Sequence, residues 1–186
     1  GTGGRGINVQ LGAQLNISYA MIDENREFGV FVSNEGSTLF AQHIVVQNTL
    51  PASCYDDEFL DCGIGGGFGD GILGIGGVDI TLLDFTIENT HRVGLYLYDT
   101  AGTPAEVPSG PLDTAITGAP TLSAQNGTIH NNAVGIMIRG DSVTQDDFIN
   151  VYCSENPDTI DGCFGDRPME VPSVEDILSY MADSTD

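Results

Sequence analysis

The chain contains no lysine and no tryptophan, and basic residues are scarce throughout. Five arginines stand against 27 aspartates and glutamates, which leaves a formal net charge of -22 at pH 7. Such a charge repels the phosphates of nucleic acids and of anionic membrane surfaces, so we exclude nucleic acid as a partner. Acidic uronate polymers are disfavoured for the same reason, unless a cation such as calcium bridges the two.

Long apolar runs are also missing. No stretch approaches the roughly 18 consecutive apolar residues that a membrane-spanning helix needs, so we expect no membrane insertion. The sequence shows no signal peptide and no initiator methionine, since it starts Gly1-Thr2-Gly3-Gly4. We interpret it as a mature product or as a fragment excised from a longer protein.

Cysteines are few and fall as two close pairs, Cys54 with Cys62 and Cys153 with Cys163. Four cysteines allow three pairings, and closeness in sequence favours these two, each closing a loop. A zinc site is the weaker alternative, because the spacings are not CxxC and the three histidines lie elsewhere. Disulfides predict an extracellular or cell-surface location.

The sequence does contain a repeat, in which an asparagine-bearing turn is followed by a glycine that opens a short apolar strand. These glycines are Gly6, Gly29, Gly71, Gly94 and Gly135. Two of the spacings are 23 residues, and the other two, 42 and 41, hold one repeat plus an insert at about 50–69 and 100–120. A fixed period in the twenties with inserts in certain copies is typical of a solenoid. We expect both inserts to project from one side of it.

The segments between the glycines read as short strands. Leu15, Ile17, Tyr19 and Met21 alternate with other residues at the two-residue period of a strand, and β-branched and aromatic residues recur. The sequence therefore predicts an all-β solenoid of about five coils over residues 1–167.

The tail at 168–186 has a different pattern. Ser173 stands where a helix N-cap would, and Val174, Ile177, Leu178 and Met181 share one helical face. Because a solenoid exposes its core at an uncovered end, we expect this short helix to cap or flank the C-terminal end.

With its glycine-led strands and recurring asparagines, the chain resembles the right-handed parallel β-helix family, the pectate-lyase-like group of secreted repeat proteins. The asparagines that carry the resemblance are Asn25, Asn48, Asn89, Asn131 and Asn156. The resemblance implies that they stack along one turn of successive coils. It also implies an interior row of Ile7, Val30, Ile72, Leu95 and Ile136. Members of that family include lyases, hydrolases, adhesins and inert stalks, so fold alone does not assign a function.

Three functions fit these observations. The leading hypothesis is a non-enzymatic extracellular module, structural or adhesive, that presents a long face to glycans or proteins. The runner-up is a carbohydrate-active enzyme, either a polysaccharide lyase or a glycoside hydrolase, with its cleft between the two inserts. End-to-end self-assembly into a filament is the third, because open coil ends can template a neighbour.

An enzyme would need a base beside a charge stabiliser, or two carboxylates facing each other across a cleft. Arg139 and Asp141 come nearest to the first pattern, with Arg26 and Arg92 at related turn positions. For the second pattern, the candidate carboxylates are Asp146 or Asp147 with Asp84 on an earlier coil. The competing interpretation is that these arginines pair with nearby acids and that abundant acids form such pairs by chance.

Calcium is the one cofactor that the sequence suggests. Asp56, Asp57, Glu58 and Asp61 crowd the first cysteine loop and offer hard oxygen ligands. The glycine-rich run 66–70, which ends in Asp70, partly matches a calcium-binding nonapeptide. His43, His91 and His130 lie in different coils and are expected to be isolated turn residues rather than a metal site.

Overall fold

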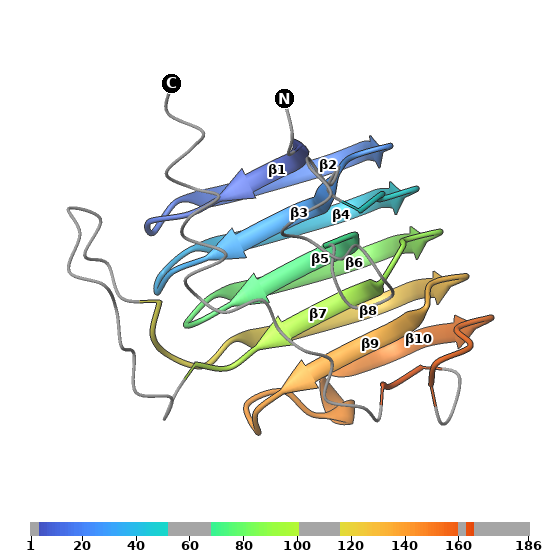
Figure 1. The fold of residues 1–186 in the computed structure, drawn as a ribbon. Coiled ribbons are helices and arrows are strands. Elements are labelled where there is room, and N and C mark those ends of the chain that lie inside the picture. The colour runs from blue at the N-terminus through green and yellow to red at the C-terminus, as the bar shows by residue number, and fades with distance from the viewer. Residues whose placement is uncertain (1–3, 52–67, 101–115, 160–162, 166–186) are drawn as a thin grey trace, which may run out of the picture.

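The computed structural model describes residues 4–51, 68–100, 116–159 and 163–165. This part of the chain is all-β and forms two parallel five-stranded sheets, which we call sheet A and sheet B (Figure 1). Sheet A has the order β1-β3-β5-β7-β9, and its strands are β1 (Gly4–Val9), β3 (Glu27–Ser33), β5 (Asp70–Ile75), β7 (Val93–Tyr98) and β9 (Val134–Arg139). Sheet B has the order β10-β8-β6-β4-β2, and its strands are β2 (Gln14–Asp23), β4 (Thr38–Gln47), β6 (Asp79–Glu88), β8 (Thr121–His130) and β10 (Phe148–Ser154).

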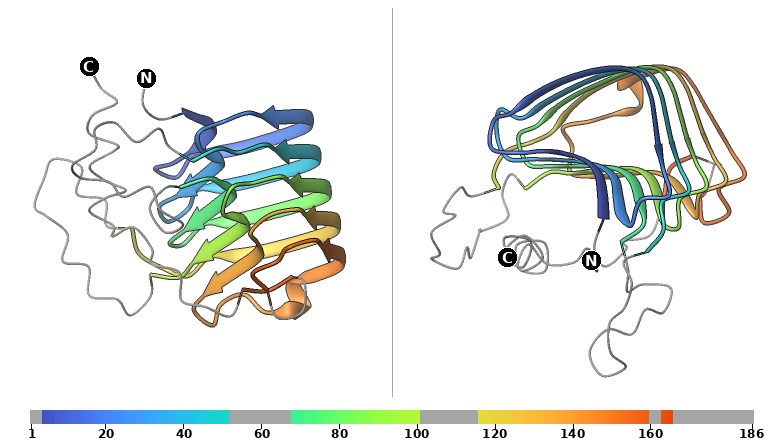
Figure 2. Two further views of the ribbon diagram at one scale, coloured as in Figure 1. Left: turned by 45° about the vertical axis from the view of Figure 1, so that its right-hand side comes forward. Right: turned by 90° about the horizontal axis from the view of Figure 1, so that it is seen from above.

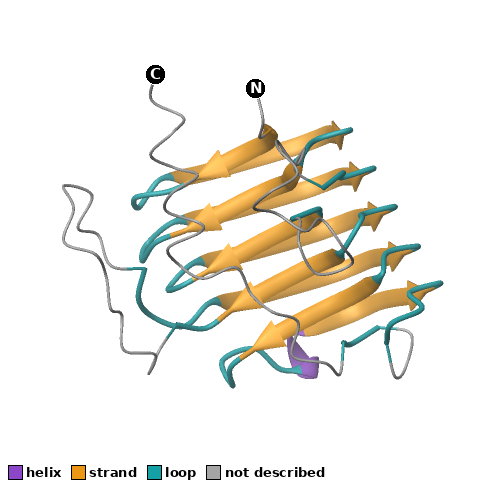
Figure 3. Cartoon of the chain, in the orientation of Figure 1, coloured by secondary structure: helices purple, strands orange, loops and turns teal. Residues whose placement is uncertain are grey.

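The chain visits the two sheets in turn, so each pair of successive strands forms one repeat. Seen from above, the five repeats lie over one another (Figure 2). Apart from the strands there is one 3₁₀ turn, η1 (Gln145–Asp147), ahead of β10 in the described residues (Figure 3). No helix in this part of the chain has the length and apolar character of a membrane span.

The predicted interior row is confirmed. Ile7 pairs with Val30, Val30 with Ile72, Ile72 with Leu95 and Leu95 with Ile136, one residue from each strand of sheet A. Val30, Ile72, Leu95 and Ile136 are buried in the core between the sheets, and the partly buried Ile7 packs against it. Sheet B contributes the opposite wall through rows such as Ala41, Leu82 and Ala124, which are in register and buried.

The repeating glycines allow the repeats to approach closely. A Cβ atom on Gly29 would lie 2.7 Å from the carbonyl oxygen of Gly71, and one on Gly71 would lie 2.5 Å from that of Gly94. The same Cβ atoms would also meet sheet B, at Val46 and Ile87 respectively. No real Cβ is accommodated at such distances, so the period read from the sequence marks a steric requirement of the stack.

The middle of sheet A is buried on both faces. Every residue of β3 and of β5 is buried. Its outer face carries an in-register row of Phe31, Leu73, Tyr96 and Met137, which belongs to a second apolar cluster together with Phe68 and Ile116. Of the two outer sheet faces, sheet B therefore offers the exposed one.

The inserts leave the stack at different turns, and the expectation that both project from one side stays a prediction. The first lies between β4 of sheet B and β5 of sheet A, whereas the second lies between β7 of sheet A and β8 of sheet B. Because sheet A strands are entered at one end and left at the other, the two inserts are anchored at opposite ends of those strands. Residues 52–67 and 101–115 themselves are outside the described part.

The C-terminal end of the stack is tied by the predicted Cys153–Cys163 disulfide, which is present with a Cα–Cα distance of 5.0 Å. Phe164 forms a parallel bridge to Ile136, and the nitrogen of Gly165 donates to the Ile136 carbonyl. The Cys54–Cys62 pair and the helix expected in 168–186 lie outside the described residues.

Candidate binding face

The outer face of sheet B is built from alternating strands. In β6, for example, Ile80, Leu82 and Ile87 are buried, while Thr81 and Thr86 remain partly exposed. Because the strands are in register, outward residues align in rows across the sheet. One such row is Ser18, Gln42, Leu83, Gln125 and Ile149, and another is Met21, Val45, Thr86, Thr128 and Tyr152.

Each strand of sheet B bends at one position, and these positions form what we call the corner row: Tyr19, His43, Asp84, Asn126 and Asn150. All five have left-handed backbone, with φ between 52° and 57°. The bend interrupts the alternation, so that two consecutive residues, such as Ser18 and Tyr19, both face outward. The corner row therefore adds an extra line of outward side chains to the face.

The corner row is continuous through contacts from strand to strand. The Tyr19 and His43 rings stack with centroids 4.7 Å apart. His43 Nδ1 lies 3.7 Å from Asp84 Oδ2, and the Asn126 amide donates to Asp84 Oδ1 at 3.2 Å. The Asn150 amide in turn donates to Asn126 Oδ1 at 3.3 Å.

Acidic groups on this face lack arginine partners, since none of the five strands of sheet B contains lysine or arginine. Asp23 accepts from the Asn48 amide at 2.8 Å, and this hydrogen bond is the main cause that lowers the pKa of Asp23. Asp79 accepts from the Thr121 hydroxyl, and Glu88 lies 2.8 Å from His130 Nε2. The face thus carries acidic groups without basic ones, next to exposed apolar side chains such as Met21 and Ile149.

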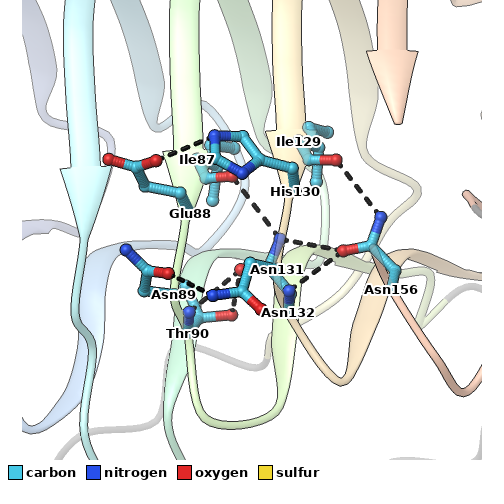
Figure 4. Close-up of polar contacts among 9 residues, drawn as sticks. All are labelled: Ile87, Glu88, Asn89, Thr90, Ile129, His130, Asn131, Asn132 and Asn156. Atoms are coloured by element: carbon cyan, nitrogen blue, oxygen red, sulfur yellow. Dashed lines mark hydrogen bonds and ion pairs between the residues drawn. The ribbon is translucent and has the colours of Figure 1, made fainter. Parts of the chain in front are cut away.

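The predicted row of five stacked asparagines is wrong in register, because the structure has two neighbouring rows at that turn (Figure 4). Asn48, Asn89 and Asn131 belong to the outer row, with left-handed φ of 53–55°, and Asn131 donates to Asn89. Asn25 and Asn156 lie one residue further along, with Thr49, Thr90 and Asn132 at the equivalent inner positions. The sequence pattern merged the two rows because both contain asparagines and their positions differ by one residue.

Asn132, which the sequence analysis missed, connects three successive turns. Its Oδ1 accepts from the nitrogen and the hydroxyl of Thr90 at 3.0 and 2.8 Å. Its backbone nitrogen and its amide donate to Asn156 Oδ1 at 3.0 and 3.2 Å. The adjacent asparagines 131 and 132 were the signal in the sequence, because Asn131 belongs to the outer row and Asn132 to the inner row.

Arg92, directly before β7, is held in a buried ion pair, which corrects the idea that it lines an exposed edge. Arg92 Nε and Nη2 donate to both oxygens of Asp70 at 2.8 and 2.5 Å, and both side chains are buried. Burial disfavours the charged guanidinium, but the charge and hydrogen bonds of Asp70 outweigh it and raise the pKa of Arg92. Asp70 is therefore committed to this pair and is not a ligand of the calcium nonapeptide type.

A second pair joins Arg5 to Glu27 at 3.5 Å. Here burial dominates for both partners: it lowers the pKa of Arg5 and raises the pKa of Glu27 against their mutual attraction. Both pairs keep the stack together rather than meeting a substrate.

The predicted catalytic residues lie at the C-terminal end of the stack. Arg139 ends β9, with its guanidinium carbon 5.8 Å from the Tyr98 ring centroid, and Asp141 is exposed in the turn that follows. Asp146 and Asp147 lie in η1, where Asp147 accepts from the Thr144 nitrogen at 2.7 Å. Asp84 is engaged in the corner row, so the structure gives Asp84 and Asp147 separate local partners.

The candidate calcium ligands Asp56, Asp57, Glu58 and Asp61 lie outside the described residues. Within the described ranges, no group of three or more His, Cys, Asp or Glu side chains is placed to hold a metal ion. His43 and His130 face outward from different rows of sheet B, and His91 is exposed in a turn, so the three histidines are separate.

No protein-family model matches this chain, and neither a curated protein nor a solved structure shows significant similarity to it.

Proposed function

We propose that this chain is a non-enzymatic extracellular module that binds polysaccharide on the outer face of sheet B. The observation that carries the proposal is that face itself: five strands in register present rows of hydroxyl, amide and carboxylate groups with exposed Tyr19 and Tyr152 among them. Side chains of this kind offer a sugar both hydrogen bonds and apolar contact. Within each row the side chains repeat at the strand spacing of about 4.8 Å, which suits a polymer whose sugar units also repeat.

We further infer that the alternation between two parallel sheets is a right-handed parallel β-helix. Each connection from one strand of a sheet to the next passes through the other sheet, and such parallel crossovers are right-handed in nearly all known cases. A rigid scaffold of this type suits an adhesive or structural role, because it holds the outward rows at fixed separations.

Binding is favoured over cleavage by the way in which the charged groups are used. Two arginines are held in pairs with Asp70 and Glu27, and Asp147 is bonded to the backbone of its own turn. Lyase or hydrolase chemistry would need such groups to converge on one reacting atom. The disulfide Cys153–Cys163 and the acidic surface support an extracellular location.

The proposal is tested by incubating the protein with insoluble cellulose, chitin and mannan, and measuring the bound fraction. Thr86→Arg places a long side chain in the middle of the face and should reduce binding at least tenfold. Ser142→Arg, the same change in charge and size at an exposed turn away from the face, should leave binding unchanged. Equal binding by both variants would contradict the proposal, and so would release of unsaturated products or reducing ends, with or without calcium.

End-to-end assembly is a second candidate, supported by the N-terminal end of the stack. Ile17 and Ala20 of β2 are only partly buried, whereas their partners in β4, Ala41 and Ile44, are buried. β1 and β2 are also the edge strands of their sheets: in the described residues each pairs with one neighbouring strand and has no strand on its other side. Assembly through this end predicts a molar mass in light scattering that rises with concentration, and a constant monomer mass would exclude it.

A further inference from the structure

Tyr19 occupies the least expected position in the corner row. Its φ of 57° is left-handed. Asparagine and aspartate, which fill three of the other positions, tolerate this conformation because their short side chains bond locally, whereas it is unusual for a bulky residue. Packing does not explain the tyrosine either, since 81% of it is exposed. A strained residue whose side chain is this exposed is a candidate for a functional role.

The surroundings of Tyr19 form a platform for a flat ligand. Its ring stacks on His43 with centroids 4.7 Å apart and an interplanar angle of 23°, so the imidazole supports one face of the tyrosine ring and the other face, toward the edge of sheet B, is left for a ligand. Met21, two residues along the same strand, is 66% exposed and extends the apolar area. A sugar ring that lies on this surface would contact it through its apolar C–H groups.

Polar groups continue from the platform along the corner row. Asp84 follows His43 on the next strand, and the amides of Asn126 and Asn150 follow on the two strands after that. Four strand spacings of about 4.8 Å give a track about 19 Å long from Tyr19 to Asn150. One side chain per strand is thus available to each successive unit of an extended polymer.

The charge of the face selects among polymers. Asp23, Asp79, Asp84 and Glu88 lie on sheet B, and none of its strands contains lysine or arginine to offset them. A protonated amino group is attracted both to a carboxylate such as Asp84 and to the face of a tyrosine ring. Uronate and sulfated polymers would be repelled.

We propose that the corner row is a binding track for a linear glycan bearing free amino groups, with Tyr19 stacking on a sugar ring and Asp84 pairing with an ammonium group. This inference rests on the proposed polysaccharide binding and specifies its site and ligand class. The acidic face would also attract a lysine-rich peptide, but the exposed aromatic pair and the even spacing favour the sugar.

The test uses isothermal titration calorimetry at low salt with four probes: the hexamer of glucosamine, the hexamer of N-acetylglucosamine, cellohexaose and hexalysine. The wild-type chain should bind the glucosamine hexamer more tightly than the other three. Tyr19→Asn should weaken that binding at least tenfold without lowering the melting temperature, because asparagine accepts the left-handed backbone. Leu11→Asn makes the same kind of replacement at another exposed residue with left-handed backbone, φ 58°, in the turn between β1 and β2, and should change that binding less than twofold.

Asp84→Asn separates charge from shape, because asparagine keeps the left-handed conformation and an amide in the row. It should weaken the affinity for the glucosamine hexamer at least fivefold and leave any affinity for cellohexaose unchanged. Full affinity in Tyr19→Asn would overturn the track, and hexalysine binding as tightly as the glucosamine hexamer would assign the face to a basic peptide. Preference for a neutral hexamer would overturn the amino-sugar inference but keep the proposed function, whereas no binding of any glycan would overturn both.

Discussion

At the level of single residues, the glycines set the closest approach between repeats. The Cβ positions of Gly6, Gly29, Gly71 and Gly94 all fall within 2.5–2.7 Å of a carbonyl oxygen in the next repeat. These glycines do not need an unusual φ; they need the absence of a side chain. That is why the sequence period was readable: the same steric demand returns in each repeat.

Replacement of Gly71 by alanine should destabilise the protein by about 1–3 kcal/mol, the usual range for overpacking a core. The added methyl group would lie 2.5 Å from the Gly94 oxygen and 2.6 Å from an Ile87 methyl group. Gly4→Ala is the matched control in the same sheet, because its Cβ would meet nothing closer than 3.6 Å. Urea unfolding measures both, and equal midpoints for the two variants would contradict the steric explanation.

The Asp70–Arg92 pair is a second feature at this scale, because it buries two charged side chains away from water. Asp70→Asn should cost about 3–5 kcal/mol, since it leaves the Arg92 guanidinium buried without a counter-charge. The double variant Asp70→Leu, Arg92→Met should recover a large part of that loss, since it leaves no uncompensated charge. A double variant as unstable as Asp70→Asn, measured by the same urea unfolding, would show that the pair contributes more than mutual neutralisation.

At the level of elements, the two sheets have different sequence patterns. Strands of sheet A are nearly continuous apolar runs, such as 28–32 and 93–97, which is typical of strands covered on both faces. Strands of sheet B alternate, which is typical of strands with one open face. This difference was available in the sequence and would have identified sheet B as the exposed face.

The sequence was sufficient for the interior row and for the C-terminal disulfide, because both depend on a local period or a short separation. It was insufficient for the turn rows, where Asn131 and Asn132 differ by one residue and only the backbone conformation separates their roles. Glycine spacing located the inserts in the sequence, but it counts residues per repeat and does not show which of the two turns of a repeat lengthens. The corner row was hidden because Tyr19, His43, Asp84, Asn126 and Asn150 share a backbone conformation rather than a residue type.

Replacement of Asn132 by alanine should destabilise the turn by at least about 2 kcal/mol, since it leaves several buried polar groups without partners. Among them are the nitrogen and the hydroxyl of Thr90, which both lose Asn132 Oδ1 as their acceptor, whereas Asn156 Oδ1 keeps the bond from the backbone nitrogen of residue 132. Asn131→Gly is the control: it removes the neighbouring exposed amide while keeping a residue that accepts the left-handed φ of 54°. Hydrogen exchange should show faster opening of this turn in Asn132→Ala alone, and equal effects of both variants would contradict the assignment of the two rows.

At the level of the whole molecule, stacking distributes surfaces in a simple way. One outer sheet face is buried by an apolar cluster, the other is open and acidic, and the C-terminal end is joined by a disulfide. The charge of -22 is compatible with this arrangement because most carboxylates of the described residues lie at outward positions, while the buried Asp70 has its own arginine. A polymer-binding role for the open face depends on the rows running unbroken across all five strands of sheet B.

That continuity is tested most directly by spin labels at Ser18→Cys and Ile149→Cys, which are the two ends of one outward row. Pulsed electron–electron double resonance measures the distance between the two labels in solution. No reductant is added, so that the native disulfide stays intact. Four strand spacings of about 4.8 Å predict a single distance peak near 20 Å, widened by the label linkers. A peak well beyond that span, or a broad distribution without a peak, would contradict the stacking on which the binding face depends.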